Sequence, residues 1–307
     1  MNSDDFSISV IVPVTDMADR LRRMEKWISE ADKRIEVIIV HDYRDQQTLN
    51  ELVTLSTKYG IEIINGVYGS PGAARNAGIQ KASKNWIIFV DSDDFPEIPR
   101  FIKMIQDAEI RRCEVSVGSY LVMDSKTDLK LWDSMIPVDR REQIKYFGTD
   151  PGVWRYAFKR SLIGDIKFPD LSMAEDIVFL SLIHATRPSI YVSEEIVYNY
   201  YRNDPKQLTN GKFLHKDSLH SLKLLLENKE RGNLTFPSIS FFFYAKLFNT
   251  VMVRGGLRER FMALRLTSSF IWSPKSLGTF IKLEMILARE AGLSLFKILL
   301  RKIGFIR

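Results

Sequence analysis

Apolar and polar residues follow two different periods along the first hundred residues, and their order predicts an α/β fold. Short, mostly apolar runs at residues 8–14, 35–40, 61–64 and 86–90 predict strands, and the unbroken run at residues 86–90 is typical of a strand buried on both faces. The segments between these runs carry apolar residues at helical spacing. On the first segment these residues are Leu21, Met24, Trp27 and Ile28, and on the second, residues 46–59, they are Leu49, Leu52, Val53 and Leu55. This order implies a mostly parallel sheet with helices on both faces, as in the nucleotide-binding half of a Rossmann-like fold.

The middle of the chain predicts that the sheet continues with mixed strand directions. Residues 96–112 predict a helix, residues 114–122 a strand, and residues 129–132 its partner in a hairpin. Downstream, an aromatic strand is expected to end at Arg202. The chain should therefore complete a mixed sheet before it changes character.

From residue 212 the pattern turns helical, with helices expected at residues 212–230, 238–253, 257–270 and 275–303. We therefore expect an α/β domain at residues 1–211 and a helical extension at residues 212–307. Within the first domain, residues 1–112 form the nucleotide-binding half and residues 113–211 the acceptor half.

The chain is organised around residues 70–94, which read SPGAARNAGIQKASKNWIIFVDSDD. Ser70-Pro71-Gly72 predicts a turn, and a short helix follows with Arg75 and Asn76 in its first turn. The buried strand at residues 86–90 then leads directly into Asp91-Ser92-Asp93-Asp94. These motifs therefore meet at the carboxyl end of a strand, where open α/β sheets bind ligands.

Three acidic residues in four repel one another unless a cation or a set of donors relieves their charge. Mg2+ and Mn2+ prefer carboxylate oxygens, usually one or two of them together with substrate phosphates. Asp91 and Asp93 are therefore candidates for holding a metal-bound, phosphorylated ligand. The alternative is a plain loop in which Asp94 caps the following helix.

These motifs resemble the signature of family 2 glycosyltransferases with the GT-A fold. In that family an A-R-N-x-G-I helix start, an apolar strand and D-S-D-D follow one another, as they do here. The likeness extends to an acidic pair, Glu175-Asp176, and to an aromatic Y-x-Y-R strand at residues 198–202. It covers about residues 7–210, while the last third of the chain matches nothing comparable.

The resemblance implies a role for each candidate residue on the donor side. The donor would be a nucleotide-sugar, most simply a UDP-sugar, held with Mg2+ or Mn2+ by Asp93 and Asp91. The other donor-side residues are expected to be Pro13 and Val14, which line the base pocket, Asp42, which contacts the base or ribose, and Arg75, Asn76 and Ser92. Arg75 can pair with the diphosphate or with the acidic loop, and the sequence leaves that choice open.

On the acceptor side, the resemblance makes Asp176 the base that takes the proton from an acceptor hydroxyl, and Glu175 a residue that orients it or contacts the acceptor. The first turn of a helix suits such a carboxylate because the helix dipole stabilises its charge. The alternative is that both acids simply decorate a helix N-terminus. The Q-x-x-R-W motif of processive members is missing, so we expect transfer of one sugar per encounter, with inversion, to a glycan or lipid-linked acceptor.

One loop departs from the family pattern. His41-Asp42-Tyr43-Arg44 stands where D-D-G-S is usual, so Tyr43 can stack on a base and Arg44 can pair with a phosphate, or both can be plain surface residues. His41 is expected to be a packed or surface histidine rather than a ligand. The altered loop favours an alternative function, a catalytically silent sugar-nucleotide-binding or scaffold protein. A nucleotidyltransferase would need a glycine-rich loop after the first strand, which residues 14–17 lack.

Charge is concentrated at the end of the chain. Residues 274–307 contain seven basic and two acidic residues and so carry +5 of the total net charge of +6. A near-neutral body argues against a nucleic-acid partner, while a basic amphipathic tail favours contact with an anionic membrane surface. The alternative is that the tail packs on the body or on a second subunit, which leaves a homodimer open.

The single cysteine, Cys113, suits a reducing compartment, and residues 1–10 lack the pattern of a signal peptide. We therefore expect a cytoplasmic protein, placed at the inner face of the plasma membrane if its tail binds lipid.

Overall fold

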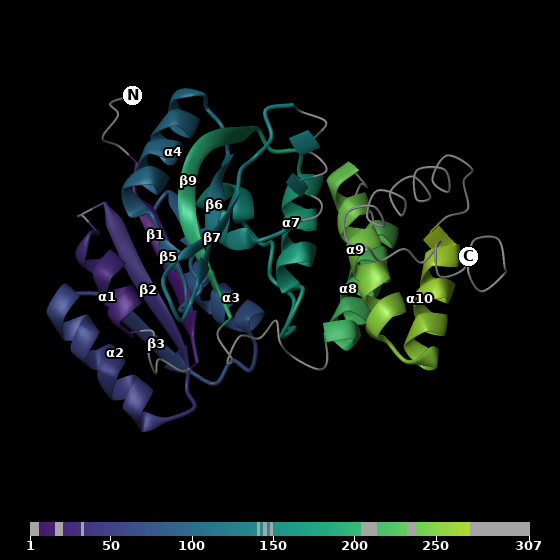
Figure 1. The fold of residues 1–307 in the computed structure, drawn as a ribbon, viewed down its shortest axis with the longest axis horizontal. Helices are drawn as coiled ribbons and strands as arrows, with labels where there is room; N and C mark the ends of the chain where they lie inside the picture. The colour runs from purple at the N-terminus through teal and green to yellow at the C-terminus, as the bar shows by residue number, and fades with distance from the viewer. Residues whose placement is uncertain are drawn as a thin grey trace. The chain divides into compact units, whose positions relative to one another are not determined.

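The computed structural model describes residues 6–15, 21–31, 34–139, 142–143, 146–147, 150–203, 214–231 and 238–270 (Figure 1). The chain forms two compact units. The first contains residues 1–137, 152–175 and 187–210, and the second contains residues 138–151, 176–186 and 211–307. All strands of the described chain belong to the first unit.

Nine strands of the described chain form one mixed sheet, in the order β3-β2-β1-β4-β8-β6-β9-β5, with β7 paired to β6. The parallel strands of the nucleotide-binding half are β1 (Ile8–Val14), β2 (Ile35–Asp42), β3 (Glu62–Gly66) and β4 (Trp86–Phe89). The others are β5 (Phe95–Pro96), β6 (Val115–Asp124), β7 (Lys130–Ser134), β8 (Tyr156–Lys159) and β9 (Ile190–Arg202). Strand β9 runs parallel to β6, whereas β8, β7 and β5 form antiparallel pairs. The predicted mixed α/β sheet and the β6–β7 hairpin are confirmed.

Local sequence signals set the helix ends in this half. Helix α2 (Gln46–Tyr59) begins at Asp45, whose side chain accepts a hydrogen bond from Thr48 N, and ends at Gly60, with φ of 65°. Helix α3 (Pro71–Lys81) begins at Ser70, whose hydroxyl accepts from Ala73 N. The caps at Asp45 and Ser70 set where the loops before α2 and α3 end.

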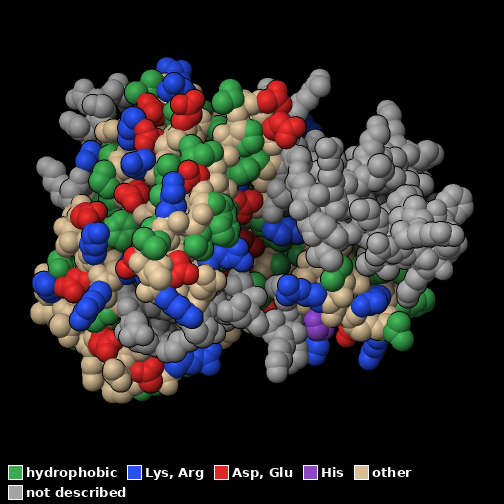
Figure 2. Space-filling view, in the orientation of Figure 1, with side chains coloured by type: hydrophobic (Ala, Val, Ile, Leu, Met, Phe, Trp, Pro, Cys, Tyr) green, Lys and Arg blue, Asp and Glu red, His purple; other side chains and the backbone are tan. Residues whose placement is uncertain are grey.

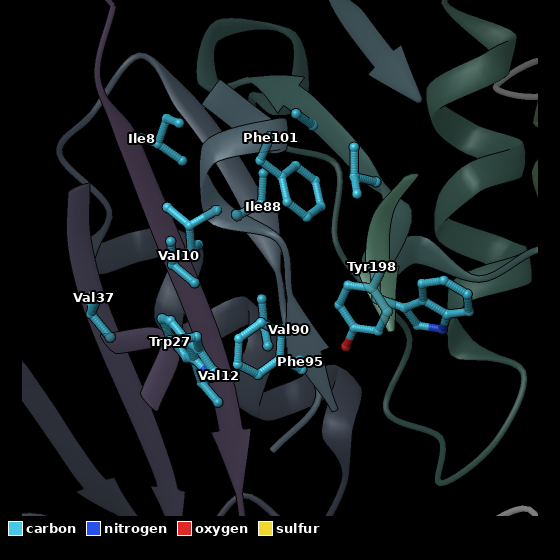
Figure 3. Packing of buried hydrophobic residues seen from close by; sticks show 14 of the residues in the cluster. Ile8, Val10, Val12, Trp27, Val37, Ile88, Val90, Phe95, Phe101 and Tyr198 are labelled. Atoms are coloured by element: carbon cyan, nitrogen blue, oxygen red, sulfur yellow. The ribbon is translucent and has the colours of Figure 1, made fainter. Parts of the chain in front are cut away.

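Helices cover both faces of the parallel strands. Alternate residues of β1, including Val10 and Val12, pack in one core with residues of α1 (Leu21–Ser29), α2 and α4 (Ile98–Ile110), and Figure 3 shows part of this core. On the opposite face Gly78 of α3 lies against Ile11, and a Cβ at Gly78 would clash with that side chain. The glycine therefore lets α3, which carries Arg75, lie close to the sheet.

Two expectations about these helices are wrong. Val53 is 50% exposed, because the buried face of α2 follows Thr48, Leu52 and Leu55, which lie one helical turn apart. The helix expected at residue 96 begins at Ile98 instead, since Pro96 pairs with Tyr198 in the edge strand β5. Proline has no N–H to donate, so an edge strand tolerates it.

The second unit contains helices α8 (Leu214–Glu230), α9 (Ser238–Arg254) and α10 (Leu257–Phe270), as the periodicity predicts. Tyr244 of α9 and Thr267 of α10 share a buried hydrogen bond of 2.9 Å. None of the helices that the structure describes has both the length and the hydropathy needed to cross a membrane. The basic segment 274–307, with its expected helix, lies outside the described residues.

Candidate active site

The acidic loop at residues 91–94 follows β4 and is closed by a turn in which Asp94 N donates to Asp91 O (3.0 Å). Asp91 and Asp93 are half-buried, whereas Ser92 and Asp94 are buried. The first and third acids therefore remain within reach of a ligand at the carboxyl end of the strand, as the sequence predicts.

Asp94 does not cap the following helix, as the alternative interpretation would have it. Its side chain instead holds the acidic loop in place. It is 1% exposed and accepts a hydrogen bond from Tyr201 N (2.7 Å), which ties the acidic loop to β9. Glu97, not Asp94, is the residue directly before α4, and its side chain makes no capping hydrogen bond. Burial and the charges of Asp93 and Asp91 raise the pKa of Asp94 well above its usual range. The loop therefore presents its negative charge through Asp91 and Asp93.

Arg75 joins two acidic motifs that the sequence singles out separately. Its guanidinium lies 2.8 Å from Asp91 Oδ1 and 2.5 Å from Glu175 Oε1, and the residue is 4% exposed. Burial alone would lower the pKa of Arg75, but the two carboxylates raise it above its usual value, so the side chain stays charged. Of the two partners that the sequence offers Arg75, this structure shows the acidic loop.

Glu175 and Asp176 begin α7 (Glu175–Ala185) but have different surroundings. Glu175 is 7% exposed, and burial raises its pKa above its usual value although Arg75 opposes that shift. Asp176 is half-buried, and its carboxylate accepts a hydrogen bond from Ile177 N (2.8 Å) in the first helical turn. Asp176 is therefore the more accessible of the two carboxylates, and the helix N-terminus favours its charged form.

Asn76 holds a neighbouring loop. Its amide donates to Phe168 O (2.8 Å) and accepts from Phe168 N (2.9 Å), so both ends of the side chain are occupied. Ser70 donates to Asp170 (2.5 Å) in the same loop, and a Cβ at Gly72 would clash with Pro169 O. In this structure Asn76 therefore positions residues 168–170 against the start of α3.

The carboxylate of Asp42 likewise binds groups of the protein itself. The side chain is 2% exposed, accepts from Tyr68 N (2.7 Å) and Gly69 N (3.2 Å), and pairs with Arg44 (2.9 Å). Burial opposes ionisation of Asp42, but these backbone hydrogen bonds and Arg44 hold its pKa below the usual range. Asp42 thereby fixes the loop between β3 and α3.

The end of β1 lies beside the end of β2, which carries Asp42. Pro13 pairs with Val40 and Val14 with His41 in the parallel register of β1 and β2. His41 is fully buried and hydrogen-bonds Asn65 (2.9 Å), so of the two expected positions, packed or at the surface, it has the packed one. Val14 is buried and Pro13 is half-buried, so Pro13 is the more exposed of the two at this strand end.

The chemistry of Asp91 and Asp93 fits a Mg2+ or Mn2+ ion that takes its other ligands from a bound diphosphate. Nowhere in the described part of the chain, the acidic loop included, do three His, Cys, Asp or Glu side chains gather into a metal cage. One oxygen of Asp91 is held by Arg75, which orients the carboxylate and leaves its second oxygen for a ligand.

The sequence profile of Glycosyl transferase family 2 matches residues 9–172, which contain the whole parallel half and the acidic loop. The chain belongs to glycosyl transferase family 2. Among its relatives, the glycosyltransferase EpsJ of Bacillus subtilis is 26% identical over 217 residues, which cover 66% of this chain and 62% of EpsJ. UDP-Glc:alpha-D-GlcNAc-diphosphoundecaprenol beta-1,3-glucosyltransferase WfaP of Escherichia coli is 21% identical over 67% of this chain and 81% of WfaP.

Solved structures confirm the fold of this family 2 glycosyltransferase. S. aureus TarS (residues 1–349) in complex with UDP-GlcNAc superimposes with a TM-score of 0.64 at 17% sequence identity. The match covers 92% of this chain and 83% of TarS. The predicted GT-A architecture is therefore confirmed, including a helical C-terminal part.

The sequence did not predict the cluster of stacked aromatic rings that adjoins the acidic loop, which we call the aromatic floor. Trp154 stacks on Tyr198 (4.6 Å between ring centres) and on Tyr200 (5.4 Å), and Tyr198 OH accepts from Asp91 N (3.0 Å). Period-two spacing of Tyr198 and Tyr200 was a usable signal for one shared strand face. The sequence carries no local sign that Trp154, more than forty residues away, completes it.

Proposed function

We propose that this chain is an inverting glycosyltransferase that moves one sugar from a nucleotide-sugar, with a UDP-sugar as the favoured donor, to a hydroxyl of a glycan or lipid-linked acceptor. The observation that carries the proposal is the link from Asp91 through Arg75 to Glu175, which joins the acidic loop to the start of α7. That link supports donor-side and acceptor-side functions at one site.

Asp93 and Asp91 would hold Mg2+ or Mn2+ beside the diphosphate of the donor. When bound, such an ion acts as a Lewis acid that offsets charge on the departing nucleoside diphosphate. Asp176 accepts the proton of the acceptor hydroxyl while the hydroxyl oxygen attacks the anomeric carbon and the bond from that carbon to the nucleoside diphosphate breaks. The new glycosidic bond has inverted configuration. Glu175 is engaged by Arg75, so we assign it the positioning of Asp176 rather than contact with the acceptor.

The donor pocket is assigned to the strand ends around Pro13, Val14 and Asp42. Asp42 would contribute through the loop that it fixes, and Ser92, Arg75 and Asn76 would contribute by holding the acidic loop and the start of α3. WfaP, by its name, acts on a lipid-linked diphosphate sugar, and this supports an acceptor of that class in polysaccharide biosynthesis.

A silent sugar-nucleotide-binding or scaffold protein is the second candidate. The pairing of Arg44 with Asp42 favours it, since that pairing occupies a carboxylate that the family uses for the nucleotide. Retention of Asp91, Asp93 and Asp176 at accessible positions favours catalysis.

The proposal also includes a domain division at residue 211 and a homodimer. It further includes attachment of the tail, residues 274–307, to the inner face of the plasma membrane. The positive charge of the tail supports the last of them.

Calorimetric titration with UDP, GDP, CMP and dTDP, each with and without Mn2+, tests the proposal. We expect metal-dependent binding of UDP above the others. If none of the four nucleotides binds, the transferase assignment is wrong and the altered loop after Asp42 becomes the central fact. A nucleotide that binds without any transfer from its sugars would favour the silent alternative.

A further inference from the structure

Strand β7 exposes a tryptophan at the edge of the sheet. Within the described chain β7 pairs only with β6, and Trp132 is 46% exposed. The guanidinium of Arg202, at the end of β9, lies 5.5 Å from the centre of the Trp132 ring. No carboxylate pairs with Arg202 in the part of the chain that the structure describes. The exposed indole and the neighbouring guanidinium together offer a ligand an apolar face and a positive charge.

The strand register places this tryptophan on the same face as the aromatic floor of the site. Trp132 lies opposite Val122 on β6, and Val122 lies opposite Tyr200 on β9. Directly paired residues project from the same face of a sheet, so all three side chains share one face. Two strand spacings separate Trp132 from Tyr200, a backbone distance of about 10 Å.

Neighbouring side chains therefore connect the acidic loop with the edge of the sheet. This connection begins at Tyr198, whose hydroxyl holds the backbone of Asp91, and passes through Trp154, which stacks between Tyr198 and Tyr200. From Tyr200 it continues across β6 to Trp132. Tyr198, Trp154 and Val122 are buried, so the half-buried ring of Tyr200 and the exposed ring of Trp132 are the parts of this face that an acceptor can contact.

We propose that Trp132 and Arg202 form an acceptor subsite that binds a sugar ring and the phosphate next to it. The C–H face of a sugar ring buries apolar surface on an indole, and a guanidinium binds phosphate oxygens in a bidentate manner. This inference rests on the proposed function, because it assigns the outer part of the acceptor for the same transfer.

A membrane surface is the competing partner. Leu129, Leu131 and Met135 are also exposed in this hairpin, and Figure 2 shows hydrophobic side chains with Lys or Arg beside them on the face where β6 and β7 lie in Figure 1. The sheet face that Trp132 shares with the half-buried Tyr200 favours the sugar-phosphate, since a membrane patch needs no continuity with the site. The guanidinium directly over the ring favours it as well, because it offers a sugar and its phosphate adjacent contacts.

Calorimetry at saturating UDP and Mn2+ tests the subsite with two probes that share the sugar- or polyol-phosphate chemistry. One is N-acetylglucosamine linked through diphosphate to a short prenyl chain, and the other is a ribitol phosphate trimer. We expect at least one probe to bind, and the tighter one identifies the source of the phosphate. Trp132→Ala should weaken that probe about tenfold, and Arg202→Gln should weaken it by a similar factor.

Controls separate the possible failures. Leu129→Ala removes an exposed apolar side chain from the same hairpin and should leave probe affinity unchanged. Arg202→Gln should leave the weak binding of N-acetylglucosamine without phosphate unchanged. A folding defect would weaken the binding of this sugar as well. All three variants should bind UDP like the wild type.

If UDP binds but neither probe does, or if Trp132→Ala binds the tighter probe as well as the wild type, the subsite is wrong while the proposed function stands. Failure of UDP to bind the wild type would remove the proposed function itself. Loss of binding to phosphatidylglycerol vesicles in both Trp132→Ala and Leu129→Ala, with unchanged probe affinity, would assign the surface to a membrane and overturn the subsite.

Discussion

Arg75 Nη1 lies 2.5 Å from Glu175 Oε1, although 100 residues separate the two in the chain. Both side chains are almost fully buried, and the second arm of the guanidinium reaches Asp91. One buried cation thus serves two carboxylates. Removal of that cation would leave both acids without a partner, which costs more than the pair itself contributes.

Arg75→Met should therefore lower the free energy of unfolding by about 3–5 kcal/mol. Urea unfolding followed by far-UV circular dichroism measures it. Lys81→Met is the matched control on α3, because Lys81 pairs with Glu62 at the surface, and its loss should cost less than about 1 kcal/mol. Equal losses in the two variants would show that burial does not strengthen the Arg75 contacts.

Asp93→Asn should weaken Mn2+-dependent UDP binding on the order of tenfold or more, because it removes a proposed carboxylate ligand. Asp94→Asn makes the same change one residue along, at a buried side chain that binds Tyr201 N, and it should keep the metal dependence. Calorimetry with and without Mn2+ measures both variants. An unchanged metal dependence in Asp93→Asn would refute the assignment of the ligand.

Asp176→Asn should retain UDP binding and lower kcat by about 10²–10⁴, since an amide cannot take the acceptor proton. Release of UDP in the presence of acceptor measures turnover. Asp165→Asn, an exposed acid in the preceding loop, should keep normal kcat. Normal turnover in Asp176→Asn would mean that another group is the base.

The sequence predicted those parts of the molecule that periodicity and short motifs encode. The order of strands and helices, the turn at Ser70 before α3, and the position of Asp91 and Asp93 after β4 all follow from neighbours in the chain. Strand β9 was anticipated only from residue 198 because its first half mixes exposed, half-buried and buried residues. Sheet pairing with β6, not its own pattern, extends it back to Ile190.

Contacts between distant segments account for what the sequence did not predict at the site. Asp42 and Asn76 both carry the residue type that the family motif requires, yet their partners here are the backbones of Tyr68 and Phe168. Whether a polar side chain faces a ligand or its own chain depends on loops that pack from elsewhere. Asp94 likewise differs from Asp93 only through burial against β9.

His184 is a buried histidine near the end of α7, and burial lowers its pKa to about 4. Its pKa in the unfolded chain is about 6.5, so between pH 6.5 and 4 the unfolded state binds more protons than the folded state. The contribution of His184 to stability is therefore complete above pH 6.5 and falls as the pH decreases through this window. At pH 5 the loss should be about 2 kcal/mol relative to pH 7.5.

His184→Gln cannot be protonated, so its free energy of unfolding should fall by about 2 kcal/mol less than that of the wild type between pH 7.5 and pH 5. Urea unfolding at a series of pH values measures this difference in slope, which remains readable even if the substitution lowers stability at every pH. His220→Gln is the control, because it makes the same substitution at an exposed position on α8. If His184→Gln and the wild type lose stability in parallel, protonation of His184 does not couple to folding.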